Sequence, residues 1–235
     1  MEFTFDRRFS ANWSVQGSYR WSRLFGNYEG FYRDDNGQSD LGITSLFDFP
    51  TNDPSYTQIG VPQFGYRGDV RYQGALGNGP LPLDRPHQIK LYGNYSFAMG
   101  LNLGGAINLS SGKPLTALAS NPNINYQNGG EVPETPRGGG IQTIDGFKTR
   151  TPFQRTVDAR LDYSLKFGGV RRATLIADVF NLFDSQTVLD YDTWTESTTG
   201  ALNPNFGQPT TSALGGNPPQ LQAPRQLRVG VRFEF

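Results

Sequence analysis

The chain ends on a regular alternation of apolar and polar side chains. Across QLRVGVRFEF, residues 226–235, every second position is apolar, and the positions between are polar, charged or glycine. Successive side chains of an extended strand point to opposite faces. This segment therefore predicts a strand with one apolar face and one polar face.

The same period of two recurs in six further segments. Apolar and polar residues alternate in each, although Ile176 and Phe180 interrupt the pattern of the sixth. We therefore expect an all-β chain of about seven strands, the first of them partial. The apolar positions of the six segments lie within residues 3–5, 13–21, 89–97, 101–109, 157–167 and 173–179.

The connections between these segments alternate in length. Short turns are expected near residues 7–12, 98–100 and 168–171, whereas long stretches rich in Gly, Pro and Asn cover about 24–85, 112–152 and 190–222. In an antiparallel meander this places every long connection at the same end of the sheet. Structureless loops of such length are uncommon in compact soluble domains. Short turns at one end and long loops at the other are typical of an outer-membrane β-barrel.

The apolar faces fit two environments, either the interior of a soluble β-sandwich or the acyl chains of a membrane. The loop pattern favours the membrane, and so do the aromatic residues, which lie at or near the strand ends where barrels carry aromatic girdles. These aromatic residues are Trp13, Trp21, Tyr95, Phe97, Phe167 and Phe235.

Side chains can be assigned to the two faces of the predicted barrel wall from the alternation alone. The apolar set is expected to face lipid, and the charged set is expected to face a polar lumen. The lipid-facing set is Leu161, Tyr163, Leu165, Val229, Leu91, Leu103 and Ile107. The lumen-facing set is Asp158, Arg160, Asp162, Lys166, Arg228 and Arg232.

Composition narrows the class of protein. The hydrophobic content is only 36%, while 29 Gly, 16 Pro and 13% aromatic residues favour many short strands joined by loops. There is no cysteine, so no disulfide or thiolate site can form. Lys and Arg total 21, as do Asp and Glu, and no basic run is present, so nucleic acid is not an expected partner.

Seven strands do not close a bacterial barrel, because single-chain barrels have an even number of strands. An unpaired strand edge is also unstable in hydrocarbon. The segment after Met1, EFTFDRR, is not the basic and then apolar segment of a signal peptide. We therefore expect residues 1–235 to be the carboxy-terminal portion of a larger barrel, whose earlier strands, plug and signal peptide lie upstream.

Candidate chemistry is sparse. His87 is the one histidine, so a metal cluster or a histidine-based triad lacks members. The stretch RDDNGQSD, residues 33–40, departs from the calcium-loop spacing and lacks its closing Glu. Asp158 and Asp162, four residues apart on one strand, would be about 13 Å apart, too far for a glycosidase pair. No catalytic, cofactor or metal residues are assigned, and the chain is not expected to be an enzyme.

Several segments resemble, in the same order, the last strands of TonB-dependent outer-membrane receptors, and the resemblance is closest to the Oar-like subgroup. It covers nearly all the predicted strands but not the three long loops. The segments are FDRRFSANWSVQGSYRWSRLFGNYEG, LDRPHQIKLYGNYSF, GLNLGGAINLSSGKPLT, DVFNLFDSQTV and the terminal RFEF.

This resemblance implies a barrel of about 22 strands with a plugged lumen, located in the outer membrane of a Gram-negative type of cell. It implies ligand capture by the external loops and uptake driven by the TonB system, which would act through the plug. The solute stays open among a siderophore, an oligosaccharide and a peptide. Loop aromatics that could stack against it are Tyr28, Tyr32, Tyr56, Tyr66, Tyr126 and Trp194, and these side chains could equally pack their own loops together.

The terminal alternation also resembles the signal by which the barrel-assembly machinery recognises its clients, through strand addition at a sheet edge. Val231, Phe233 and Phe235 would form that signal. A second hypothesis is a structural or adhesin-like protein that uses the same sheet as a surface anchor and has no transport activity. A plug-encoding segment upstream would favour the transporter.

Overall fold

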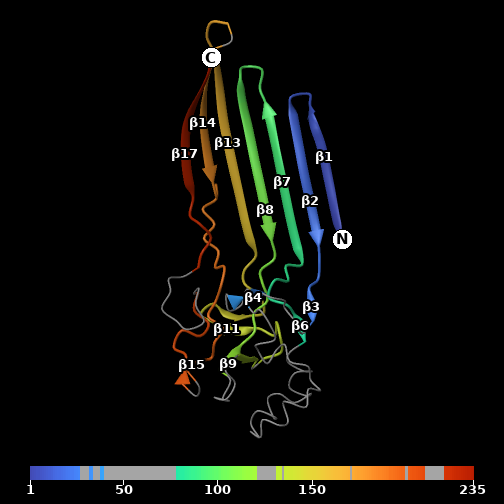
Figure 1. The fold of residues 1–235 in the computed structure, drawn as a ribbon, viewed down its shortest axis with the longest axis vertical. Coiled ribbons are helices and arrows are strands. Elements are labelled where there is room, and N and C mark those ends of the chain that lie inside the picture. Colours follow the sequence, from blue (N-terminus) through green and yellow to red (C-terminus); the bar gives the residue numbers. More distant parts are fainter. Residues whose placement is uncertain are drawn as a thin grey trace.

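A computed structural model describes residues 1–26, 32–33, 38–39, 78–120, 131–133, 135–169, 171–198, 201–209 and 220–235. One seven-stranded sheet dominates the described residues (Figure 1). In the ranges described, no helix is long and apolar enough to cross a membrane. The strands of the sheet, in order, are β1 (Glu2–Ser10), β2 (Trp13–Trp21), β7 (His87–Ser96), β8 (Leu101–Ser110), β13 (Gln154–Lys166), β14 (Arg172–Phe180) and β17 (Gln226–Glu234).

Every strand of this sheet pairs antiparallel with its neighbours in chain order, so the sheet is a meander without crossovers. The short turns lie at one end of the sheet and the long connections at the other (Figure 1). The predicted strands, their order and the common end of the long loops are thus confirmed. As described, the sheet is open, with β1 and β17 at its two edges.

The first hairpin differs from the prediction. A partial strand and a turn over residues 7–12 were expected, but β1 has nine residues and the turn is reduced to Ala11 and Asn12. Both turn residues have positive φ, 51° and 72°, which is the sign that a two-residue type I′ hairpin requires. The expectation was wrong because Arg7 and Arg8 were taken as turn residues, whereas a register shift between Arg7 and Ser10 keeps this stretch in the strand.

The register joins the seven separate alternations into two continuous faces. Residues directly opposite each other in an antiparallel pair share a face. One row across the sheet runs Val15, Gly93, Gly105, Ala159, Val179 and Leu227. Neighbouring rows on the same side are mostly apolar, so one face is mainly apolar across the sheet. Its charged members in the described strands are Arg7, opposite Val15, and Arg155, opposite Leu109. Ile176 and Phe180, which break the alternation, lie on the other face opposite Gly230 and Gln226.

The described parts of the long connections form short strands and a small core, whereas the sequence predicted structureless loops. Their described parts form a loop module, defined here as residues 78–86, 111–118, 135–153, 185–198 and 201–209. Its small core consists of Leu115, Ala117, Ile141 and Tyr191, with Val188 and Phe206 packed against it. Two-stranded sheets form in this part of the chain: β3 (Phe25–Gly26) with β6 (Gly79–Pro80), β4 (Tyr32–Arg33) with β5 (Gln38–Ser39), β9 (Leu118–Ser120) with β10 (Glu131–Pro133), β11 (Ile141–Thr143) with β12 (Gly146–Lys148), and β15 (Glu196–Thr198) with β16 (Ala201–Leu202).

An ion pair between Asp84 and Arg150 joins two segments of the loop module, and a hydrogen bond to Leu24 links it to the chain that leaves β2. The Asp84 side chain is 3% exposed, and its Oδ1 accepts a 2.7 Å hydrogen bond from the Leu24 amide while its Oδ2 pairs with the Arg150 guanidinium. Arg150 also donates to the carbonyls of Asp84, at 2.9 Å, and Gly112, at 3.1 Å. Four segments that are distant in sequence therefore meet at one buried carboxylate.

Asn181 ties the end of β14 to two other segments. Its Nδ2 donates to the carbonyls of Ser185, at 3.0 Å, and Ala223, at 2.8 Å, and its Oδ1 accepts from the Ser185 amide at 2.9 Å. Its own amide donates to Asp158 Oδ1 at 2.8 Å. Asn181 has φ 50° and Asp184 has φ 52°, and Asn and Asp tolerate this left-handed conformation best among residues with a side chain. These bonds give the NLFD segment a structural role.

Replacing Asn181 by Ala should lower the free energy of unfolding of the detergent-folded full-length protein by about 1–3 kcal/mol, because Asn181 is buried and its partners would be left unpaired. Urea titration measures this. Asn181→Gly should be nearly as unstable as Asn181→Ala. If the glycine variant recovered wild-type stability, the backbone conformation and not the side-chain bonds would be what Asn181 provides.

Replacing Asp84 by Ala should open the loop module without unfolding the sheet, because it leaves a partly buried Arg150 without its carboxylate. Breaking a buried pair costs about 3–5 kcal/mol, and the 29% exposure of Arg150 places the effect at the lower end. Hydrogen exchange of the Leu115 and Thr151 amides should accelerate strongly. Arg172→Gln is the control, since its pair with Glu234 is over 40% exposed on both sides and should contribute under about 1 kcal/mol.

Candidate functional site

The polar face of the sheet carries a ladder of ion pairs centred on Asp178. Asp178 Oδ2 lies 2.9 Å from Arg228 Nη2, and Oδ1 lies 3.5 Å from Arg160 Nη1. Arg160 Nε lies 3.5 Å from Asp162, which accepts a 2.7 Å bond from Asn102. The Asp178 side chain is 7% exposed and lies between Arg160 of β13 and Arg228 of β17. The ladder therefore cross-links β8, β13, β14 and β17.

All six residues predicted to line a lumen lie on this face by register, and so does Asp178, which the prediction missed. Arg232 pairs with Glu234 at 3.2 Å, and Lys166 lies opposite Arg172. Asp158 accepts a hydrogen bond from the Asn181 amide. Asp178 was missed, although it alternates with Ala177 and Val179 and the period of two could have placed it.

The apolar face holds all seven residues predicted to face lipid. Leu161 is 45% exposed, Val229 73% and Val231 54%. The main-sheet strands contact only their neighbours in the meander strongly, so in the described ranges no second sheet seals this face. A sandwich interior, the competing environment for these side chains, would have buried them.

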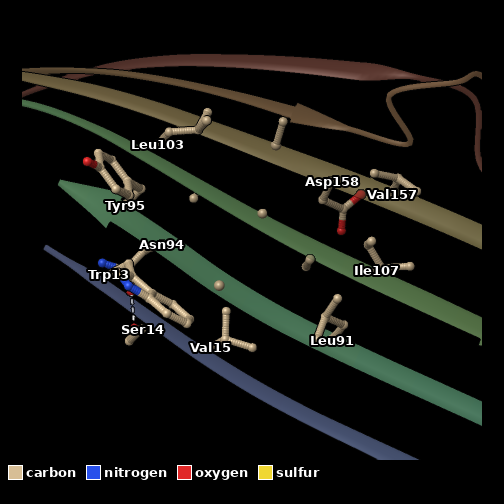
Figure 2. A pocket seen from close by; sticks show the side chains of 15 residues that line it. Trp13, Ser14, Val15, Leu91, Asn94, Tyr95, Leu103, Ile107, Val157 and Asp158 are labelled. Atoms are coloured by element: carbon tan, nitrogen blue, oxygen red, sulfur yellow. Dashed lines mark hydrogen bonds between the residues drawn. The ribbon is translucent and has the colours of Figure 1, made fainter. Parts of the chain in front are cut away.

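A groove crosses the apolar face over β2, β7, β8 and β13, with a cavity volume of about 680 Å³. Gly93, Gly105 and Ala159 form its floor, because they are the small members of one cross-strand row. Figure 2 shows the larger side chains that flank it. Leu91, Ile107 and Val157 line one side, and Trp13, Tyr95 and Leu103 line the other.

The residues predicted as an assembly signal end the edge strand β17. Val231 and Phe233 pair with Leu175 and Ala173 of β14, and Phe235 follows the strand. The rings of Phe233 and Phe235 stack with centroids 6.5 Å apart, and Phe235 is 92% exposed. An apolar strand end is therefore presented at an open edge.

Of the six loop aromatics predicted to meet a ligand, only the Trp194 side chain lies within the described residues. Trp194 is half-buried in the loop module, where its amide donates to Asp192 Oδ1 at 3.0 Å and its carbonyl accepts from Asn203 Nδ2 at 2.8 Å. Both are main-chain contacts, and the indole Nε1 of Trp194 is buried without a hydrogen-bond partner among the described residues. Tyr28, Tyr56, Tyr66, Tyr126 and the side chain of Tyr32 lie outside the described residues.

Titratable groups are buried inside the loop module and were not predicted. Burial raises the pKa of Asp192, although hydrogen bonds from Asn203 and the Trp194 amide oppose the shift. Burial and the nearby Asp145 raise the pKa of Tyr191 to about 12. Lys113 Nζ pairs with Asp190 at 2.8 Å, and the two side chains are 5% and 15% exposed. These groups hold the segments of the module together.

A metal or a reaction centre finds little support in the described ranges. They contain no group of three or more His, Asp or Glu side chains that could hold a metal ion. His87 begins β7, and its Nδ1 lies 2.8 Å from the Tyr19 hydroxyl, with the two rings stacked. The lone histidine thus belongs to the surface of the sheet.

Comparison with known proteins gives one informative similarity. Over 260 aligned residues the chain is 30% identical to the TonB-dependent transporter Oar of Myxococcus xanthus, and the alignment covers 98% of this chain and 22% of that protein. The chain therefore spans about a fifth of the relative's length. No family model matches the chain, and no solved structure matches it. The two-faced seven-stranded sheet and this alignment agree: the chain is a homologue of part of the TonB-dependent transporter Oar.

Proposed function

We propose that residues 1–235 form the carboxy-terminal part of the barrel wall of a TonB-dependent transporter in the outer membrane. The apolar face contacts lipid, the face with the Asp178 ladder lines the lumen, and the short turns lie on the periplasmic side. The remaining strands, which complete a barrel of about 22, and the plug belong to the full-length protein.

The observation that carries this proposal is the mainly apolar face that extends across all seven strands of the main sheet. Monomeric soluble proteins rarely expose a contiguous apolar patch larger than a few hundred Å², and this face spans every strand of the main sheet. The opposite face carries paired charges, and the polar interior of a barrel can solvate them. Acyl chains on one side and a polar lumen on the other satisfy both faces at once.

The full-length protein would capture a solute with its external loops and carry it through the plugged lumen with energy from the TonB system. The loop module forms part of that external surface. Its buried ion pairs and small core make it a rigid scaffold, which can position the loops that bind a ligand. The solute class, whether siderophore, oligosaccharide or peptide, is set by loops and a plug that lie largely outside the described residues.

The relationship to a transporter supports uptake over the alternative of a surface anchor without transport. The two differ in a feature outside this chain, because a transporter needs a plug. A plug-encoding segment upstream in the same reading frame supports the transporter, and its absence would favour the anchor.

Nitroxide labels on single cysteines should test which medium each face contacts. In a cysteine-free full-length protein in native membranes, labels at Leu161 and Val229 should collide mainly with dissolved oxygen, because oxygen concentrates in lipid. Labels at Arg160 and Arg228, on the other face, should not. Collision rates would then alternate with a period of two along each strand. Equal access of a water-soluble nickel reagent to both faces contradicts the proposal.

Replacing Phe235 by Ala should reduce the amount of folded, heat-modifiable protein in the outer membrane several-fold, because the terminal aromatic serves recognition during assembly. The same variant refolded in detergent should lose less than about 0.5 kcal/mol, since Phe235 is 92% exposed. Leu202→Ala is the control, because Leu202 is 87% exposed but lies far from the terminus. Equal yields of the two variants would count against an assembly signal.

A further inference from the structure

We propose that the groove over Gly93 and Gly105 binds one phospholipid, with its acyl chain in the groove and its phosphate on Arg7. The inference rests on the proposed membrane-facing orientation of the apolar face. It goes beyond that orientation, because it assigns one specific lipid to one position on a surface that otherwise contacts the bilayer at large.

The shape of the groove suits a single hydrocarbon chain. Gly93 and Gly105 leave the backbone of β7 and β8 uncovered, and larger side chains flank them on both sides (Figure 2). The volume of about 680 Å³ lies within the range of small-molecule pockets, about 300–1,000 Å³. Membrane barrel strands tilt by about 35–45°, so a groove that crosses them slopes through the leaflet and can admit a chain from the headgroup region.

Arg7 places a positive charge beside this groove, on a face whose other charged member in the described strands, Arg155, lies at the loop end of β13. Arg7 pairs in register with Val15, which lines the groove, and its guanidinium lies 3.7 Å from the ring centroid of Trp13, which also lines it. Trp13 directly follows the Ala11–Asn12 turn, so the charge extends toward the turn end of the sheet. Long basic side chains extend toward the headgroups in this way.

The guanidinium has unused hydrogen-bonding capacity. Arg7 is half-buried, and its Nε finds no hydrogen-bond acceptor among the described residues. That nitrogen is itself buried, so a phosphate oxygen would bind the terminal nitrogens of the guanidinium, for which no hydrogen bond is found among the described residues. Arginine binds phosphate through two parallel hydrogen bonds, which makes a phosphate a better fit than a neutral headgroup.

The groove and the charge select a phospholipid over other occupants. Within a bilayer every lipid tail is as apolar as the groove, so the hydrophobic effect does not discriminate, and packing and charge decide. An unfilled groove forgoes dispersion contacts, and an acyl chain restores them. A neutral apolar chain would fill the groove but leave the Arg7 guanidinium without an anion, whereas a phospholipid of the leaflet nearest the turns supplies both an acyl chain and a phosphate.

Native mass spectrometry of the full-length protein, titrated in detergent with phosphatidylglycerol, tests the inference. Wild type should retain one phospholipid, and diacylglycerol with the same chains should bind at least about tenfold more weakly. Gly105→Leu should also weaken retention by about tenfold or more, because the side chain fills the groove. An added Cβ there meets only Asp158 O at 3.7 Å, an ordinary contact that the backbone tolerates. Arg7→Gln should have a similar effect without touching the backbone.

Matched controls separate the groove from the rest of the face. Ala177→Leu places a leucine side chain on the apolar face outside the groove, and Arg8→Gln removes the neighbouring charge. Both should stay within about twofold of wild type, and all four variants should keep heat-modifiable migration.

Unchanged retention in both Gly105→Leu and Arg7→Gln, in folded protein, overturns the inference. Equal binding of diacylglycerol and phosphatidylglycerol overturns the phosphate contact. A dimer that disappears in Gly105→Leu would assign the groove to a second copy of the chain instead. The nitroxide labels at Leu161 and Val229 lie outside the groove residues tested, so failure of the barrel proposal would show there, independently of lipid retention.

Discussion

The register of the seven-stranded sheet is the constraint on which the other features depend. Each strand alone carries an alternation that could face either way, and hydrogen bonding to its neighbour fixes which way it faces. A slip of one residue at any pair would turn a whole strand's apolar set to the polar side. Unbroken pairing from β2 to β17 instead aligns Val15, Gly93, Gly105, Ala159, Val179 and Leu227 in one row. One apolar face and one polar face follow.

The two ends of the sheet are built by different means. At the turn end, Ala11 and Asn12 close the first hairpin with two positive φ values, so the chain reverses within two residues. At the other end, long connections return through buried polar contacts centred on Asp84 and Arg150. Asn181 performs a similar function where β14 leaves the sheet. Asp84 and Asn181, in the polar motifs LDRP and NLFD near the strand ends, thus secure the connections.

Each face of the sheet has its own proposed function, one toward the lumen and one toward lipid. The Asp178 ladder cross-links the strands on the face that would line a lumen. Arg228 and Arg232 of β17 are exposed on the same face and add positive charge to it. Gly93 and Gly105 open a groove in the apolar face, and Arg7 lies beside that groove, whereas Arg155, the other arginine on this face, lies at the loop end of β13. A surface that meets only bulk lipid needs neither feature, and this is why their coincidence supports a bound phospholipid.

The sequence alone determined the seven main strands except the length of the first, their order and the faces of their side chains, because a period of two is a local property that each segment displays by itself. The kinship to TonB-dependent receptors came from the resemblance of whole segments in order. Tertiary structure decided what depends on segments far apart. Asp178 became the centre of a ladder only when β13 and β17 flanked β14, and Asp84 meets Arg150 although 66 positions separate them in the sequence. The groove likewise required Gly93 and Gly105 to fall opposite each other, a matter of register that neither strand encodes on its own.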